Sequence, residues 1–183
     1  MKTFSSDRYF RFLIATCECS RNHSKLRLRR MIRKLRYIKF AIKILQSKIF
    51  GSMTIFSKII VGEIPSYKIY ENEKFFAFLD IFPLREGHVL IVPKTETDKF
   101  FDLADEYLSE MLLFAKPIAK AIEKSFECNR CGIEVIGLEV PHAHMHLIPI
   151  NTANDLNFNQ SKLKLTNEQL EKIRDKIVSN LRS

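Results

Sequence analysis

The segment His142–Ile148 alternates histidine with apolar residues, and no other feature of the chain constrains the fold as strongly. Three of the five histidines lie within five residues, at positions 142, 144 and 146. In a β-strand every second side chain points to the same face. The segment is therefore predicted to form a strand with three imidazoles on one face and with Ala143, Met145 and Leu147 on the other.

Apolar patterns elsewhere predict four further strands and three helices. The strands are expected at residues 67–71, 74–80, 88–93 and 132–136, and the third is apolar enough to be central and buried on both faces. The helices are expected at 55–60, at 105–126 with a bend at Pro117, and from a capping box at Thr166–Gln169 to about Leu181. Because the strands outnumber the helices and are mostly sequential, we expect an α+β domain on an antiparallel sheet.

The net charge of +9 is concentrated at the start of the chain. Residues 1–52 hold 14 of the 30 lysines and arginines but only two of the 21 acidic residues. The remainder carries 16 basic and 19 acidic side chains, so it has a slight negative charge. The basic pI therefore does not indicate a nucleic-acid-binding protein, and nucleic acid is not an expected partner of the core domain.

Residues 1–52 form a basic extension that is only roughly amphipathic as a helix. Its composition is compatible with a membrane-surface helix, a nucleic-acid-binding arm or a transit-peptide-like leader. We favour the alternative that it is not native, because Met53, two residues before a segment that begins like an ordinary domain, could be the start of translation. The expected organisation is this extension at 1–52, a domain at 53–158, and a helical extension at 159–183 packed on the domain.

The four cysteines do not form a recognisable metal or redox motif. Cys128 and Cys131 have CxxC spacing, but the second pair, Cys17 and Cys19, is not spaced for zinc. A redox CxxC opens a helix after a strand, whereas this pair is expected to follow a helix and precede a strand. We therefore expect free thiols in the reducing cytoplasm. No apolar run reaches the length of a membrane-spanning helix, because Lys and Arg interrupt every candidate.

Three functions are compatible with three histidines on one strand face. They could be structural residues, although strict alternation is unusual for that role. They could bind zinc, but the nearby acid, Glu139, is not a distinctive fourth ligand. They could also act in covalent catalysis, with one neutral imidazole attacking an electrophile while its neighbours orient it and stabilise charge.

The segment Pro141–Ile148 resembles the His-φ-His-φ-His-φ-φ signature of the histidine-triad (HIT) family of nucleotide hydrolases and transferases, where φ is an apolar residue. Three further segments occur in the order and spacing of the Hint branch, which includes bacterial-type HIT proteins. These segments are 55–65, 78–81 and 87–94. The resemblance covers roughly residues 54–158, and an ordered set of four segments is more specific than one short motif.

This resemblance implies a five-stranded antiparallel sheet with one long helix, a homodimer, and a role for each matching residue. His144 matches the nucleophile that attacks the α-phosphorus of a nucleotide, and His146 matches the phosphate contact. His142 and His88 match residues that orient the nucleophile and relay protons. Asp80 matches the acid that binds the ribose. The apolar slot for the base is matched by Ile55, Phe56, Ile59, Phe78 and Ile81. This chemistry requires no metal and no cofactor.

The sequence departs from the family pattern in two places. Residues 135–140 form a shorter loop than in many relatives, without the usual Asn and with Leu138 in place of Gln. Glu139 stands where some relatives have Ser, and we expect it to contact a leaving-group amine or to point outward. The region from Leu156 onward also differs from the short Hint tail, so substrate choice is expected to differ as well.

The function implied is hydrolysis of a purine nucleoside phosphoramidate through a nucleotidyl-histidine intermediate, in the cytoplasm. Cleavage of dinucleoside polyphosphates uses the same nucleophile and is the alternative within enzymes. A nucleotide-binding regulatory protein with incidental hydrolysis is an alternative of another class. A zinc-binding module is a third.

Overall fold

The structure, a computed structural model, describes residues 53–181, and the predictions made for residues 1–52 lie outside this range. Its centre is a five-stranded sheet with the order β1-β2-β3-β5-β4. All neighbouring strands pair antiparallel, which confirms the predicted fold class. The strands are β1 (Lys68–Glu71), β2 (Phe75–Leu79), β3 (Val89–Pro93), β4 (Arg130–Glu134) and β5 (Met145–Ile150).

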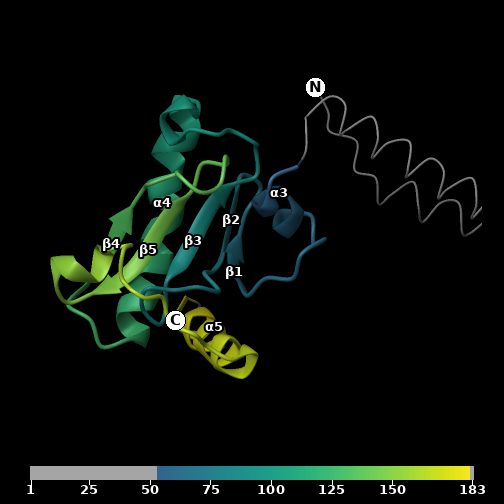
Figure 1. The fold of residues 1–183 in the computed structure, drawn as a ribbon. Helices are drawn as coiled ribbons and strands as arrows, with labels where there is room; N and C mark the ends of the chain where they lie inside the picture. The colour runs from purple at the N-terminus through teal and green to yellow at the C-terminus, as the bar shows by residue number, and fades with distance from the viewer. Residues whose placement is uncertain (1–52, 182–183) are drawn as a thin grey trace, which may run out of the picture. The chain divides into compact units, whose positions relative to one another are not determined.

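Three α-helices surround this sheet (Figure 1): α3 (Ile55–Ile60), α4 (Asp105–Ser125) and α5 (Asn167–Leu181). The described residues also form two 3₁₀ helices, η1 (Phe100–Asp102) and η2 (Ala153–Leu156). The helix α4 covers one face of the sheet and continues through Pro117, while α5 packs against α4 and β1. The predicted capping box is present, since Thr166 and Gln169 each bond the other's backbone N–H through a side-chain oxygen. Among the described helices, none is long and apolar enough to cross a membrane.

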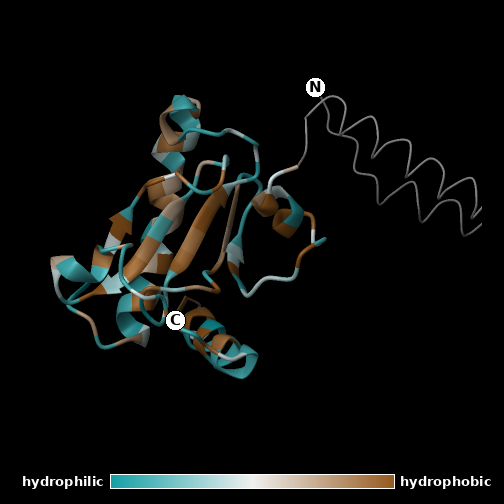
Figure 2. Ribbon diagram, viewed as in Figure 1, coloured by the Kyte–Doolittle hydropathy of each residue, from teal (hydrophilic) through white to brown (hydrophobic). Residues whose placement is uncertain are grey.

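The central strands are buried on both faces, as their near-continuous apolar sequence predicts (Figure 2). On β2, Phe75, Ala77 and Leu79 belong to the core cluster shared with α4, whereas Phe76 and Phe78 belong to a second cluster on the opposite face. This second cluster is closed by Phe56 of α3. The face of the sheet opposite α4 therefore has its own cluster of apolar side chains, and the histidines lie beside this cluster.

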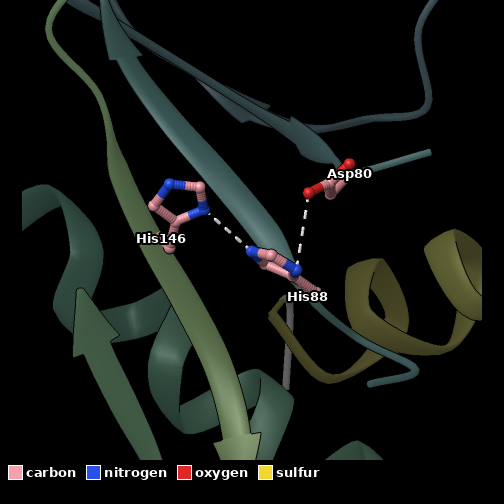
Figure 3. Close-up of side chains that lie close together, drawn as sticks. All are labelled: Asp80, His88 and His146. Carbon is pink, nitrogen blue, oxygen red and sulfur yellow. Dashed lines mark hydrogen bonds and ion pairs between the residues drawn. The ribbon is translucent and has the colours of Figure 1, made fainter. Parts of the chain in front are cut away.

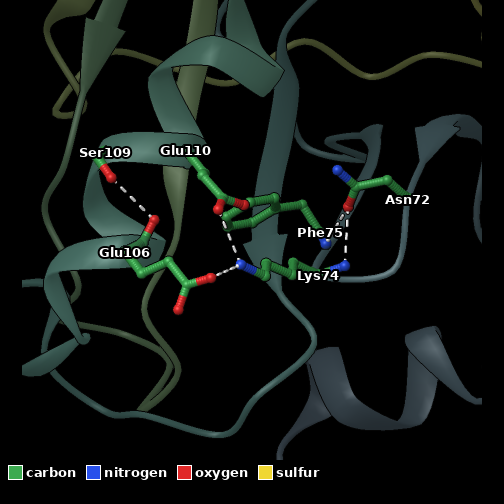
Figure 4. A network of polar contacts seen from close by, with 6 residues as sticks. All are labelled: Asn72, Lys74, Phe75, Glu106, Ser109 and Glu110. Carbon is green, nitrogen blue, oxygen red and sulfur yellow. Dashed lines mark hydrogen bonds and ion pairs between the residues drawn. The ribbon is translucent and has the colours of Figure 1, made fainter.

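The β1–β2 turn is fastened to α4 by polar contacts (Figure 4). Asn72 Oδ1 accepts the backbone N–H groups of Lys74 at 2.9 Å and Phe75 at 2.7 Å. The Lys74 ammonium in turn pairs with Glu106 and, at 2.9 Å, with Glu110 of α4. These contacts set the start of β2, the strand that directly precedes Asp80.

Two predicted strand boundaries were wrong. The strand expected at 132–136 is observed as β4 at Arg130–Glu134, so Cys131 lies within it, although Cys128 and Cys131 are free thiols as expected. The strand expected from His142 begins only at Met145. The backbone N–H of His142 bonds Val140 in a turn and that of Ala143 bonds Thr97, so neither joins the sheet.

Candidate active site

The four predicted catalytic histidines are all buried on the face of the sheet opposite α4. The rings of His144 and His146 have centroids 4.9 Å apart, and those of His88 and His146 are 5.1 Å apart. Phe56 of α3 packs edge-on against His142 at 5.8 Å and against His144 at 5.1 Å. The fold therefore brings His88, which is 58 residues from His146 in sequence, into one cluster with the triad.

The protonation of His144 follows from one hydrogen bond. Its Nδ1 lies 2.7 Å from the backbone oxygen of His142. Because a carbonyl oxygen only accepts, Nδ1 must carry the proton and Nε2 keeps its lone pair. Within the described part of the chain, no group is hydrogen-bonded to Nε2. The arrangement thus presents an imidazole nitrogen that can attack an electrophile.

The same reasoning orders the neighbouring pair, His88 and His146 (Figure 3). The N–H of Leu84 donates to His88 Nδ1 at 3.3 Å, so the His88 proton lies on Nε2 and is donated to His146 Nδ1 at 2.9 Å. The His146 proton is then on Nε2, where it can be donated to a ligand. Burial lowers the pKa of both histidines to about 3, and the positive charge of Lys162 lowers it further. Both are therefore neutral near pH 7.

Asp80 follows the last residue of β2 and faces the same pair (Figure 3). Its Oδ1 accepts the N–H of Phe82 at 2.8 Å, and its Oδ2 lies 3.5 Å from His88 Nδ1. Since His88 is neutral and Nδ1 carries a lone pair, this contact places two acceptors face to face. Burial raises the pKa of Asp80, although the Phe82 hydrogen bond and the charge of Lys162 oppose the rise. Because Oδ2 accepts no hydrogen bond from the described residues, it is available to hydroxyl groups of a ligand.

These three residues could also hold a metal ion. Asp80, His88 and His146 each offer one ligand atom, and these atoms lie within 4.8 Å of one another. Carboxylate and imidazole are common zinc ligands. A metal bound there would displace the His88–His146 hydrogen bond.

His142 differs from the other two triad histidines because both of its ring nitrogens are occupied by protein groups. Its Nε2–H donates to the carbonyl of Pro93 at 2.9 Å, and its Nδ1 accepts from the Thr54 hydroxyl at 2.8 Å. Burial lowers the pKa of His142, while the Pro93 hydrogen bond and the charge of Glu96 partly offset this. The ring is fully buried, so its contacts are made with the protein.

The residues of the predicted apolar slot divide into two groups. Phe56, Ile59 and Phe78 come together in the second apolar cluster, with the Phe56 and Phe78 rings 5.8 Å apart. Ile55 and Ile81 are instead half exposed, at 50% and 52%. Glu139 is exposed in the loop between β4 and β5.

Sequence reasoning missed Phe158, which lies in the segment after η2. Its ring packs edge-on against His146 at a centroid distance of 4.9 Å and against His88 at 6.2 Å. The segment is held by a 2.8 Å ion pair between Asp155 and Arg85 and by a 2.8 Å hydrogen bond from Leu163 N–H to the Pro83 oxygen. The departure of this region from the family pattern was the only sequence signal for such a contact. The sequence also gave no sign of Thr54 as a partner of His142.

Comparisons with known proteins agree with this geometry. A family model described as "HIT domain" matches residues 61–153. The chain is 44% identical over 96 residues to an adenosine 5′-monophosphoramidase of Saccharomyces cerevisiae, and the match covers 52% of the chain and 61% of that relative. It is 34% identical over 135 residues to an uncharacterized HIT-like protein of Borreliella burgdorferi, covering 69% of the chain and 97% of the relative.

A solved structure has the same fold. A Hit-like protein from Bartonella henselae superposes with a TM-score of 0.62 at 29% identity, and the match covers 72% of this chain and 98% of that one.

Proposed function

This chain belongs to the histidine-triad (HIT) family, and we propose that it is a nucleotide hydrolase that forms a nucleotidyl-histidine intermediate, with a purine nucleoside phosphoramidate as substrate. The observation that carries the proposal is the hydrogen bond from His144 Nδ1 to the His142 carbonyl, which leaves Nε2 unprotonated. The similarity to the yeast phosphoramidase supports the choice of a P–N bond.

In the first step, His144 Nε2 attacks the α-phosphorus, a new N–P bond forms, and the P–N bond to the leaving amine breaks. His146 Nε2–H donates to a phosphoryl oxygen and stabilises the charge that grows there. The leaving amine takes its proton from solvent water, while the hydrogen bond from His88 Nε2–H to His146 Nδ1 keeps the His146 ring oriented toward the phosphate. Water then attacks the same phosphorus, which releases the nucleoside monophosphate and regenerates His144.

The nucleotide is positioned by the remaining predicted residues. Asp80 accepts hydrogen bonds from the ribose hydroxyls through Oδ2, and this suits a carboxylate with one oxygen still available. Phe56, Ile59 and Phe78 supply the apolar wall for the base, with Ile55 and Ile81 at its exposed rim. Contact between Glu139 and the leaving group stays a prediction.

The test is to trap the intermediate. The protein is incubated with adenosine 5′-phosphoramidate labelled at phosphorus, quenched, digested and mapped by mass spectrometry. We expect a nucleotidyl group on the peptide that carries His144, and none in a His144→Ala variant. Normal turnover without a detectable adduct at His144, under conditions that preserve phosphoramidates, would contradict the mechanism.

Dinucleoside polyphosphates are a second candidate substrate class, and the charge of Lys162 favours them. The Lys162 charge lowers the pKa of Asp80, His88 and His146. It is therefore close enough to the site to attract a polyphosphate leaving group. The ratio of kcat/KM for adenosine phosphoramidate to that for a diadenosine polyphosphate distinguishes the two classes.

The protein is also proposed to be a homodimer. The strand β4 lies at the edge of the sheet, with Ile133 46% exposed, and α4 exposes Leu112 and Leu113 at 53% and 69%. An edge strand, together with exposed leucines on a helix that packs against it, is suited to pairing with a second copy. Sedimentation analysis tests this, and a monomer at micromolar concentration would contradict it.

A further inference from the structure

Three side chains connect the protein surface to the buried His142, and none of them has a role in the function proposed above. Thr54 and Ser57 lie at the start of α3, and Glu96 lies in the loop after β3. Glu96 Oε1 accepts the Thr54 backbone N–H at 2.7 Å and the Ser57 hydroxyl at 2.8 Å. The Thr54 hydroxyl lies 2.8 Å from His142 Nδ1.

The direction of each hydrogen bond in this group can be assigned. The Pro93 carbonyl fixes the His142 proton on Nε2, so Nδ1 accepts and the Thr54 hydroxyl donates. The Thr54 hydroxyl oxygen accepts the backbone N–H of Ser57 at 3.1 Å, and this hydrogen bond caps the N-terminus of α3. The Ser57 hydroxyl donates to the Glu96 carboxylate. Ser57 thus donates its N–H to Thr54 and its hydroxyl to Glu96, while Thr54 donates to His142, so the contacts link the Glu96 carboxylate to the His142 ring.

This arrangement reaches the reactive imidazole by two routes. The backbone oxygen of His142 accepts the His144 Nδ1–H at 2.7 Å, so the position of His142 sets that of His144. Phe56 follows Thr54 by two residues on α3 and packs edge-on against both rings. The first turn of α3 therefore holds the nucleophile from one side while the His142 carbonyl holds it from the other.

We propose that Thr54, Ser57 and Glu96 are positioning residues, which act through His142 to keep His144 Nε2 aligned for attack on the phosphorus. This inference rests on the proposed function. Their hydrogen bonds join three separate segments of the chain: the start of α3, the loop after β3 and the turn before β5. A displacement of about 1 Å at a reacting atom can cost on the order of 100-fold in rate, so loss of this support is expected to lower kcat.

The test compares matched variants on adenosine phosphoramidate, with kcat and KM measured separately. Thr54→Val keeps the shape and removes the hydroxyl, and we expect kcat to fall roughly 10- to 100-fold while KM changes less than about twofold. Thr54→Ser restores the hydroxyl and is expected to restore most of kcat. Glu96→Gln leaves the α3 cap and both hydroxyls in place, and a loss of roughly threefold to tenfold is expected. Ser109→Ala removes an exposed hydroxyl on α4 and serves as the control for Ser57→Ala.

A second readout is independent of substrate. Imidazole nitrogen NMR of the wild-type protein is expected to show His142 protonated on Nε2 and His144 on Nδ1. In Thr54→Val and Ser57→Ala, the His144 signals are expected to broaden or split as the ring samples more than one position. If Thr54→Val does not fold, Glu96→Gln and Ser57→Ala decide the matter.

Two results would overturn the inference. One is wild-type kcat in folded Thr54→Val, Ser57→Ala and Glu96→Gln variants. The other is an unchanged His144 NMR spectrum in all three. Failure of the proposed function is distinct from both, because it would appear as a missing adduct on His144 in the wild-type protein.

Discussion

Two groups of neighbouring residues approach His144 from opposite ends of the triad, and each ends at a carboxylate. One comprises His142, Thr54, Ser57 and Glu96. The other comprises His146, His88 and Asp80. Glu96 is exposed, and although desolvation raises its pKa, hydrogen bonds from Thr54 and Ser57 outweigh this and lower it. Asp80 is mostly buried, and its pKa is raised.

The contrast supports different proposed roles for the two carboxylates, positioning for Glu96 and ligand binding for Asp80. Glu96 receives its hydrogen bonds from the protein, so it stabilises a fixed arrangement. Asp80 receives one, from Phe82, while its Oδ2 faces a lone pair on His88. Keeping a buried carboxylate short of donors costs stability, and a ligand that brings hydroxyl groups recovers that cost.

The largest effect is expected from removing the residue on which both groups converge. A His144→Ala variant should lose kcat by on the order of 10³-fold or more, because no other described side chain can replace its Nε2 as nucleophile. Its melting temperature should fall only slightly, since the imidazole makes one hydrogen bond with the protein. Residual activity within tenfold of the wild type would mean that the nucleophile is another residue.

Removing the two carboxylates tests the contrast directly. Asp80→Asn should raise KM roughly tenfold, because a ribose hydrogen bond to a charged group is lost, and it should also raise the free energy of unfolding, because a desolvated charge is removed. Glu96→Gln should leave KM unchanged. It should lower the free energy of unfolding, because the Glu96 carboxylate accepts two hydrogen bonds from the protein. Urea unfolding and steady-state kinetics measure both. Equal behaviour of the two variants would remove the distinction between support and binding.

The buried histidines and Glu96 should affect stability over different pH ranges. His88 and His146 have pKa values lowered to about 3, so below pH 6.5 the unfolded chain binds protons that the native protein does not. The unfolding free energy should therefore fall as the pH is lowered from 6.5, by about 1.4 kcal/mol per pH unit for each histidine. The lowered pKa of Glu96 gives a contribution that is present above its ordinary value of 4.5 and lost only below it.

Urea unfolding measured between pH 7 and pH 5 reports the contribution of the buried histidines to the unfolding free energy, because the contribution of Glu96 is lost only below pH 4.5. A His88→Asn variant should show a slope smaller by about one proton over this range. A wild-type protein equally stable at pH 7 and pH 5 would mean that the two histidines are already protonated or not buried in solution.

The sheet, the long helix and the triad could be predicted because their signals are local in sequence. Alternation over seven residues predicted a strand, but local alternation does not distinguish a strand from the turn before it, so β5 was expected three residues too early. The partners of His142 could not be predicted, because Thr54 lies 88 residues away and its hydroxyl resembles an ordinary helix cap. The two hydrogen bonds of the His142 ring nitrogens depend on the tertiary structure, so the sequence could not predict them either.

The smallest effect is expected at Phe158, whose ring lies only on the His146 side of the site. An edge-on aromatic contact is worth about 0.5–1.5 kcal/mol, so Phe158→Ala should change kcat/KM roughly twofold to tenfold. The change should differ between a phosphoramidate with a bare amine and one with a bulky aromatic amine, because Phe158 faces the histidine assigned to the phosphate. Phe101→Ala removes a ring that is 85% exposed and should alter neither substrate. If Phe158→Ala and Phe101→Ala behave alike on both substrates, the segment after η2 serves only to cover His88 and His146, and leaving-group choice must come from the loop that carries Glu139.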